Sequence, residues 1–243
     1  GGNYFHSVGN VTIERDSILA FADSAEYDGD TEKVHLAGSA KVEAPNYNLV
    51  GKTIDMVLEA NNLNRIAAHE EAILNGDDLT ISSPEIELYM DDGLLGRLVA
   101  FSSPNGSGTP SRSSVPQPVA VGEGFQLTAD SLDISLPDEV MERIFAAGQA
   151  KSISSARDSL NVDLLPEIAK SDWLEGDTII VMFEPNAPAP SEGRAATDTS
   201  EPDYQIERIV SRVRARSLYR LIPSDTMALP GIDAPAIHYV TGD

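Results

Sequence analysis

The sequence predicts an all-β fold, a repetitive array of antiparallel strands, and two observations lead to this prediction. Polar and apolar residues alternate without a miss at 131–136 and nearly so at 53–58 and 85–90. A period of two places the apolar side chains on one face of a sheet. Clusters of Asp, Asn and Gly at 28–30 and 75–77 separate such segments, as turns do in hairpins. The strongest helical candidate, 160–170, is interrupted by Pro166.

The same unit recurs along the chain. Each copy begins with a small or acidic residue pair and an alternating strand, turns, and returns through an apolar strand with small residues. In order, the outgoing strands begin at residues 22, 51, 83, 129 and 176, and the returning strands begin at 33, 64, 96, 142 and 207. The pattern is cut within a unit at 8–13 and at 239–243. We therefore expect exposed terminal strands that are suited to pairing with further strands.

Two segments break this rhythm, at about 103–122 and about 184–203. Both are rich in polar residues, Pro and Gly and lack an apolar period, so burial cannot offset the entropy of ordering them. Repeat halves lie on both sides of the second segment. We therefore expect two low-complexity loops inserted into a single β array that spans 1–243.

Composition excludes several classes of function. The chain has 17 Lys+Arg and 39 Asp+Glu, a formal net charge of −22, which argues against nucleic acid as a partner and against adsorption to anionic lipid surfaces. The absence of Cys excludes a disulfide framework and a thiol nucleophile. The four His residues lack metal-ligand spacing. We expect no catalytic residues, no metal and no cofactor, and no apolar stretch approaches the length of a membrane span.

Several short motifs carry a resemblance to a known family. They are the strand starts Ala22-Asp23-Ser24, Ala129-Asp130-Ser131 and Gly176-Asp177-Thr178, the small-residue returns 37–40 and 147–150, and 215–219 followed by 237–243. Their repetition in this order resembles the OstA-like family of lipopolysaccharide-transport bridge proteins, which includes LptA-like and LptC-like proteins and the N-terminal domain of LptD. The motifs do not separate the LptA-like from the LptC-like members.

The resemblance implies a fold, a function and a location. The fold is a β-jellyroll of two facing antiparallel sheets, open along one side like a taco. Its apolar groove carries lipopolysaccharide or a related glycolipid across the periplasm without enzymatic activity, as part of outer-membrane biogenesis. The implied partners are other β-jellyroll envelope proteins, which dock by their strand edges. A signal or anchor is expected outside this chain.

The alternating segments nominate twelve apolar side chains as lipid contacts. They are Ile54, Met56, Leu58, Ile86, Leu88, Met90, Leu132, Ile134, Leu136, Ile179, Val181 and Phe183. The alternative is that each of these side chains belongs to a closed core. Burying one of them contributes about 1.5–3 kcal/mol in either case, so stability alone does not separate the two interpretations.

The segment 208–220 places five arginines on one strand face. These residues, Arg208, Arg212, Arg214, Arg216 and Arg220, are candidates for contacts with phosphorylated headgroups, because guanidinium groups bind phosphate in a bidentate way. The alternative, favoured by the acidic composition, is cross-strand pairing with carboxylates.

Two other functions stay open on the sequence alone. One is a structural or protein-interaction spacer with a closed core. The other is a carbohydrate-active β-solenoid enzyme, against which the aromatic content of 6% weighs.

Overall fold

The computed structural model describes residues 3–15, 17–77, 79–102, 116–122, 124–154, 165–185, 204–221 and 235–242. Fifteen strands and two short 3₁₀ helices occupy these residues. The strands are β1 Tyr4–Arg15, β2 Ile18–Asp28, β3 Lys33–Glu43, β4 Tyr47–Glu59, β5 Asn62–Gly76, β6 Leu79–Asp91, β7 Leu94–Phe101, β8 Val119–Gly122, β9 Phe125–Thr128, β10 Ser131–Ser135, β11 Arg143–Ser154, β12 Asp172–Pro185, β13 Tyr204–Arg212, β14 Ala215–Leu221 and β15 Ala236–Gly242. The helices are η1 Pro137–Glu139 and η2 Glu167–Ala169.

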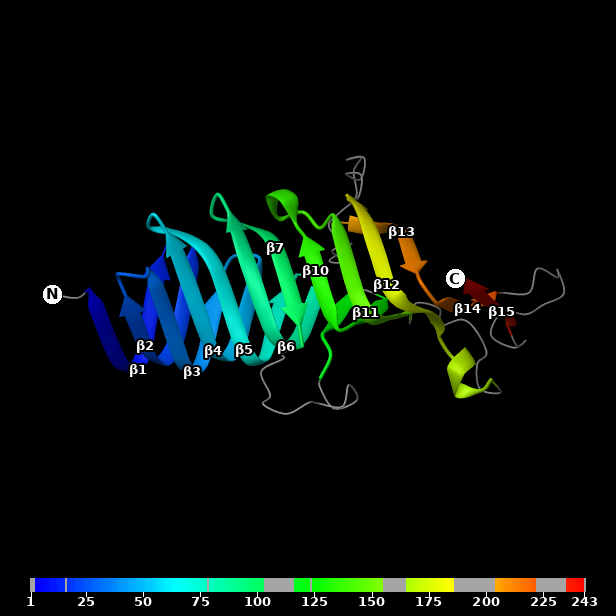
Figure 1. The fold of residues 1–243 in the computed structure, drawn as a ribbon, viewed down its shortest axis with the longest axis horizontal. Coiled ribbons are helices and arrows are strands. Elements are labelled where there is room, and N and C mark those ends of the chain that lie inside the picture. The colour runs from blue at the N-terminus through cyan, green and yellow to red at the C-terminus, as the bar shows by residue number, and fades with distance from the viewer. Residues whose placement is uncertain are drawn as a thin grey trace, which may run out of the picture.

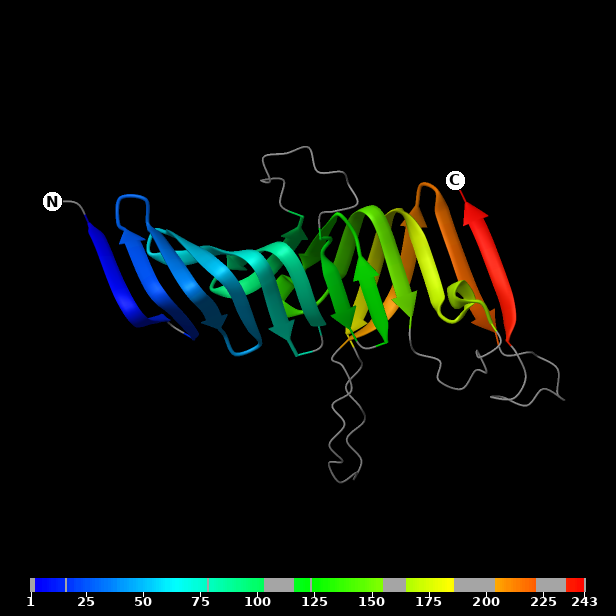
Figure 2. The same cartoon turned by 90° about the horizontal axis from the view of Figure 1, so that it is seen from below.

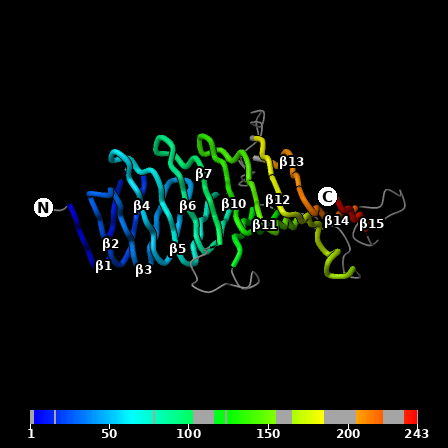
Figure 3. Tube along the Cα trace, viewed as in Figure 1, coloured from blue at the N-terminus to red at the C-terminus, as the bar shows by residue number. Residues whose placement is uncertain are grey.

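The predicted all-β antiparallel fold is confirmed. The strands form one sheet in the order β1 to β7, then β10, β11, β12, β14 and β15. Strands β8 and β9 pair with each other and join β6 to β11, and β13 pairs with β12. The strands follow one another along the long axis of the molecule, from β1 at the N-terminal end to β15 at the other (Figures 1, 2 and 3).

Most long strands are bent near their middle, where the pairing register shifts. On β3 the shift lies between Ala37 and Ala40, and on β5 between His69 and Ala72. Two consecutive residues with positive φ make the bend, Gly38–Ser39 on β3 and Glu70–Glu71 on β5. Equivalent pairs are Gly9–Asn10 on β1, Gly148–Gln149 on β11 and Val213–Arg214 between β13 and β14. This pair of left-handed residues therefore recurs on alternate strands and is the structural basis of the sequence repeat.

The bends divide the single sheet into two facing walls. Wall 1 consists of 11–15, 18–22, 40–43, 47–50, 72–76, 79–83, β8, β9, 150–154, 172–176, β14 and β15. Wall 2 consists of 4–8, 24–28, 33–37, 53–59, 62–69, 85–91, β7, β10, 143–147, 178–185 and β13. The two layers expected from the sequence are thus halves of one sheet, because most long strands contribute to both.

A continuous apolar core fills the space between the walls. Leu49, Ile81 and Leu127 of wall 1 and Ile86 and Leu132 of wall 2 are fully buried in one cluster. The period-two alternation causes this, since every second side chain on each wall points toward the opposite wall. A smaller cluster of Ala169, Trp173 and Leu218 lies apart, where η2 packs against β12 and β14.

Acidic residues of the strand starts pack against the bends. An added Cβ at Gly38 would lie 2.8 Å from the Cβ of Asp23, and one at Gly148 would lie 2.7 Å from the Cβ of Asp130. The strand-start motif and the small-residue return are therefore two sides of one contact. Charged pairs cross other bends: Lys52 Nζ lies 2.6 Å from Glu70 Oε2, and Arg214 pairs with Asp177.

Three segments differ from the expectations drawn from sequence. The loop expected at about 103–122 extends too far along the chain, because Val119–Gly122 forms strand β8. The backbone pairing of β8 with β6 outweighs the turn-rich local composition. Glu184 and Pro185 end β12, and 186–203 lie outside the described residues, as do 103–115. Of the helical candidate 160–170, only the single turn η2 is helical among the described residues. Neither described helix has the length or apolar character needed to cross a membrane.

Candidate functional site

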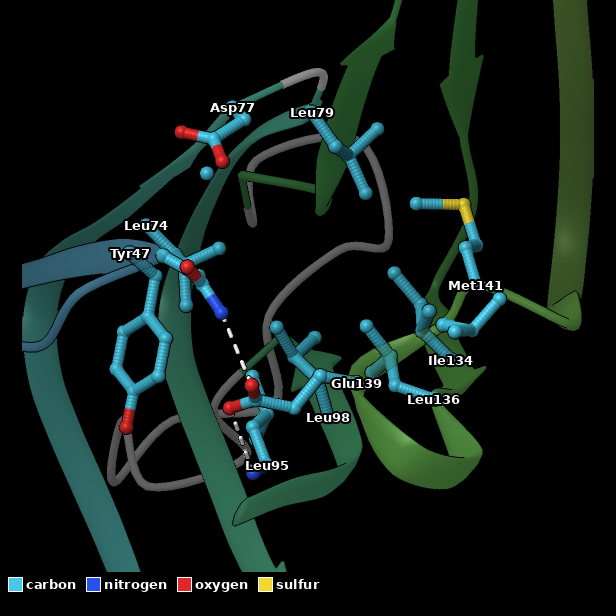
Figure 4. A pocket seen from close by; sticks show the side chains of 13 residues that line it. Tyr47, Leu74, Asp77, Leu79, Leu95, Leu98, Ile134, Leu136, Glu139 and Met141 are labelled. Atoms are coloured by element: carbon cyan, nitrogen blue, oxygen red, sulfur yellow. Dashed lines mark hydrogen bonds between the residues drawn. The ribbon is translucent and has the colours of Figure 1, made fainter. Parts of the chain in front are cut away.

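An apolar cavity opens between the rims of the two walls, on the side away from the bends. Its volume is about 490 Å³. It is lined by Asn46, Tyr47, Leu74, Gly76, Asp77 and Leu79 from wall 1 and its turns, and by Leu95, Leu98, Ile134, Leu136, Glu139, Val140 and Met141 from wall 2 and η1 (Figure 4). We call this opening the lateral mouth. Its size falls in the range of sites that hold one small ligand.

Glu139 connects the two rims across the lateral mouth. Asn46 Nδ2 donates a 2.9 Å hydrogen bond to Glu139 Oε2, and the backbone N–H of Leu95 donates to Glu139 Oε1 at 3.4 Å (Figure 4). The η1 turn places this carboxylate through two consecutive left-handed residues, Asp138 and Glu139. The mouth therefore has an apolar interior and a polar, acidic border.

Tyr47 lies in the wall of the cavity and gives the site a measurable dependence on pH. Burial raises the pKa of Tyr47 to about 12, and the negative charge of Glu139 adds to the shift. The unfolded chain loses this proton near pH 10, so the stability gained by keeping Tyr47 protonated is lost as pH rises from about 10 toward 12. We expect unfolding free energy to fall by about 2 kcal/mol over that interval, and Tyr47→Phe to lose less. Urea unfolding at pH 9, 10.5 and 12 measures the unfolding free energy of both proteins. An equal fall of that free energy with pH in the parent protein and in Tyr47→Phe would contradict the prediction.

A second opening lies between the same rims nearer the N-terminus. Its volume is about 720 Å³, and its lining includes Arg15 and Ile18 of wall 1 and Leu63 and Met90 of wall 2. At these two places the rims of the two walls are not packed against each other.

The core is also exposed at the two ends of the array. Phe5 is 63% exposed on β1, and Ile206, Ile209, Tyr219 and Val240 are exposed on β13 to β15. The pairing register places these five side chains on the inner faces of the walls. The terminal strands β1 and β15 each have one unpaired edge in the described sheet.

The twelve predicted apolar side chains occupy the inner side of wall 2, but most are packed. Nine are buried in the main core: Ile54, Met56, Ile86, Leu88, Leu132, Ile134, Ile179, Val181 and Phe183. Leu58, Met90 and Leu136 are half-buried. Ile134 and Leu136 line the lateral mouth, and Met90 lines the second opening. Only these three of the twelve border the cavities, and contact with lipid stays a prediction for the whole set.

The five predicted arginines lie outside the apolar space between the two walls. Arg208 and Arg212 are exposed on β13, across a bend from Arg216 on β14. Arg214 and Arg216 pair with Asp177 and Glu175. Arg220 is buried, donates to Asp172 Oδ1 at 2.8 Å and to the Lys170 carbonyl at 2.5 Å, and is therefore not available to a headgroup. The expected single strand is wrong here, because Val213 and Arg214 adopt left-handed conformations that separate β13 from β14.

Two of the histidines pair with carboxylates on wall 2. His35 Nδ1 lies 2.6 Å from Asp55 Oδ1, and His69 Nε2 lies 3.2 Å from Asp55 Oδ2. Within the part of the chain that the structure describes, no group of three or more His, Asp or Glu side chains is arranged to hold a metal ion.

Sequence reasoning missed the polar border of the mouth. Asn46 and Glu139 are separated by 93 residues, and neither belongs to an alternating segment. The signal that could have located them is their position next to turns, at Pro45-Asn46 and Pro137-Asp138, because turns form the rims of a bent array.

No protein-family model matches the chain, and no curated protein matches it. Among solved structures, it is similar to LptH from Pseudomonas aeruginosa, described as the LptA-homologous periplasmic component of the lipopolysaccharide transport device. The TM-score is 0.42 and the sequence identity 16%, over 54% of this chain and 82% of that chain.

Proposed function

We propose that the chain binds the acyl part of an amphipathic lipid between its two walls and passes it along the envelope without chemical change. By the resemblance of its repeats, the lipid is lipopolysaccharide or a related glycolipid, and the location is the periplasm. The observation that carries the proposal is the lateral mouth, an apolar cavity that opens between the rims and is continuous with the core.

The chemistry of the mouth supports an amphiphile rather than a polar substrate. Leu74, Leu98 and Ile134 offer only apolar contact, and the polar groups lie at the border. Alkyl groups gain free energy by leaving water for such a surface, while a headgroup at the border stays hydrated. Neither step needs a nucleophile or a general base.

The exposed ends support passage between molecules. Inner apolar side chains such as Phe5 and Ile209 are exposed where the array stops, and the outer edges of β1 and β15 are unpaired in the described sheet. Strand-edge docking of another β-jellyroll envelope protein would cover these side chains and pair these edges. The two apolar interiors would then be continuous.

A second candidate function is a structural or protein-interaction spacer with a closed core. It is favoured by the complete burial of residues such as Ile54 and Leu88. In this case the lateral mouth would be an imperfectly packed rim without a ligand.

Filling the cavity separates these two functions. Leu136→Trp places an indole in the lateral mouth, and native mass spectrometry of the protein isolated from its own cells measures bound lipid. If a bound alkyl chain and the indole compete for the same space at a cost of about 1–3 kcal/mol, as overpacking costs in a protein core, binding weakens by roughly 5- to 150-fold. We expect glycolipid on the parent protein and about a tenfold lower bound fraction on the variant.

Val121→Trp is the matched control, because Val121 is exposed on β8 and its neighbour Ala120 faces the core. It adds the same side chain outside the apolar space between the two walls and should leave the fraction of protein with bound lipid unchanged. If the parent protein carries no lipid in repeated preparations, the spacer is the better description.

A further inference from the structure

The lateral mouth and the second opening are neighbours along the same two rims. On wall 1, the β1–β2 turn lines the second opening, and the β3–β4 and β5–β6 turns line the mouth. On wall 2, the β4–β5 and β6–β7 turns line the second opening, and β7, β10 and η1 line the mouth. Met90 of the second opening is the cross-strand partner of Leu95 of the mouth. The two openings therefore adjoin at the β6–β7 hairpin.

A contact between the two walls occupies this boundary. The hydroxyl of Tyr47, which lines the mouth from wall 1, donates a hydrogen bond at 4.0 Å to Met90 Sδ, which lines the second opening from wall 2. Tyr47 is buried in the main core, and Met90 is half-buried and packs against it. The two side chains therefore cross the space between the walls and separate one opening from the other.

Each opening reaches the same apolar core. At the second opening, Ile18 belongs to the core and Leu63 packs against it. At the mouth, Leu98 and Ile134 belong to it. The two volumes, about 720 and 490 Å³, both lie in the range of small-ligand sites. Each opening therefore offers apolar contact to an alkyl chain whose headgroup stays at the hydrated rim.

We propose that Tyr47 and Met90 form a divider between two chain-binding compartments, so that each opening holds one alkyl chain and a chain in one opening does not extend into the other. This inference rests on the proposed function. It identifies Tyr47 as the residue that sets the number and the length of the alkyl chains bound along this part of the rims.

The aromatic ring of Tyr47 provides most of this barrier. A thioether sulfur is a weak hydrogen-bond acceptor, and the methionine side chain is unbranched and adaptable, so Met90 alone blocks a chain poorly. Leucine at position 47 keeps an apolar side chain in the core but lacks the ring and hydroxyl that reach Met90. Tyr47→Leu therefore removes the divider with a smaller loss of burial than an alanine would cause.

The dependence of affinity on chain length tests the divider on the full chain. Alkyl maltosides from octyl to hexadecyl, each below its micelle-forming concentration, displace a fluorescent fatty-acyl probe from the protein. Each further methylene that is buried raises affinity about fourfold. In the parent protein, we expect affinity to stop rising within the series, where the chain meets the divider. In Tyr47→Leu, it should continue to rise about fourfold per methylene, because the chain extends into the neighbouring opening.

The number of bound molecules, counted by native mass spectrometry, tests the two compartments. We expect two molecules of decyl maltoside on the parent protein. Leu136→Trp and Leu63→Trp should each hold one, because each indole fills one opening. Val121→Trp should hold two. In Tyr47→Leu, hexadecyl maltoside should bind as a single molecule, because one chain then spans both openings.

Two further variants separate the divider from a general loss of packing. Met90→Ala removes the same contact from the other wall at a half-buried position, and it should also extend the rise of affinity with chain length. Tyr89→Leu is the matched control, because Tyr89 hydrogen-bonds to Glu87 and lines neither opening. It should behave as the parent protein does.

The outcomes distinguish the divider from the proposed function. If affinity rises through the whole series in the parent protein, or stops at the same length in Tyr47→Leu and Met90→Ala, the divider is overturned and the proposed function stands. A single molecule of decyl maltoside on the parent protein overturns the two compartments. If no alkyl maltoside displaces the fatty-acyl probe and the probe itself does not bind, the proposed function fails, and the divider with it.

Discussion

Replacing Gly148 by alanine is expected to destabilise the protein by about 2–4 kcal/mol, the sum of a left-handed penalty and of steric overlap. The backbone of Gly148 has φ +80°, and an added Cβ would lie 2.7 Å from both the Cβ and the Cγ of Asp130. The neighbouring chain cannot move away easily, because the backbone N–H of Asp130 donates a 2.8 Å hydrogen bond to the Gly148 carbonyl. Urea unfolding of the two proteins measures the difference.

Gly9 provides the matched control for this prediction. It occupies the equivalent bend on β1 with φ +93°, but no atom lies within 4 Å of an added Cβ. Gly9→Ala should cost only the backbone penalty, about 1 kcal/mol. If Gly148→Ala and Gly9→Ala lower the unfolding free energy by the same amount, contact with Asp130 does not determine the bend. Asp130→Gly should recover part of the loss in the Gly148→Ala background.

Replacing Asp172 by alanine is expected to cost about 3–5 kcal/mol, because it leaves a buried guanidinium without its carboxylate. The side chain of Arg220 is 4% exposed, and Asp172 Oδ1 accepts hydrogen bonds from both its Nε and its backbone N–H. These contacts hold β14 against the start of β12. The loss should appear in urea unfolding and as faster amide exchange in β14.

Asp133→Ala is the comparison for the buried pair. Asp133 makes two hydrogen bonds to Arg97, at 2.8 and 2.7 Å, but the Arg97 side chain is 53% exposed. Exposed pairs contribute at most about 1 kcal/mol. A cost for Asp172→Ala no greater than that for Asp133→Ala would show that burial does not strengthen the pair. Replacing both partners, Asp172→Leu with Arg220→Met, should restore most of the stability.

The inner face of wall 2 was predictable because period-two alternation is a local signal. Leu132, Ile134 and Ile86 follow it, and all three are fully buried on that face. The repeat was also readable, since the residues of Ala129-Asp130-Ser131 and of Ala147-Gly148-Gln149 contact each other across a bend. Both signals depend on residues close in sequence or on recurring motifs.

The bends and the mouth were not predictable in the same way. Glu70 and Glu71 adopt left-handed conformations without a glycine, so local propensity argues against the bend that the surrounding strands impose. The pairing of Asn46 with Glu139 depends on two rims that approach only after the sheet has folded over. Strand β8 has four residues, too few for a periodic signal.

Because most long strands pass through both walls, different features set the length and the cross-section of the molecule. Neighbouring strands are about 4.8 Å apart, so adding or deleting one hairpin alters the length by about 10 Å. The cross-section is set by where each strand bends, and it stays the same. The length and the cross-section of the array can therefore change independently: duplication of hairpins lengthens the array, and substitutions at the rims change the lateral mouth.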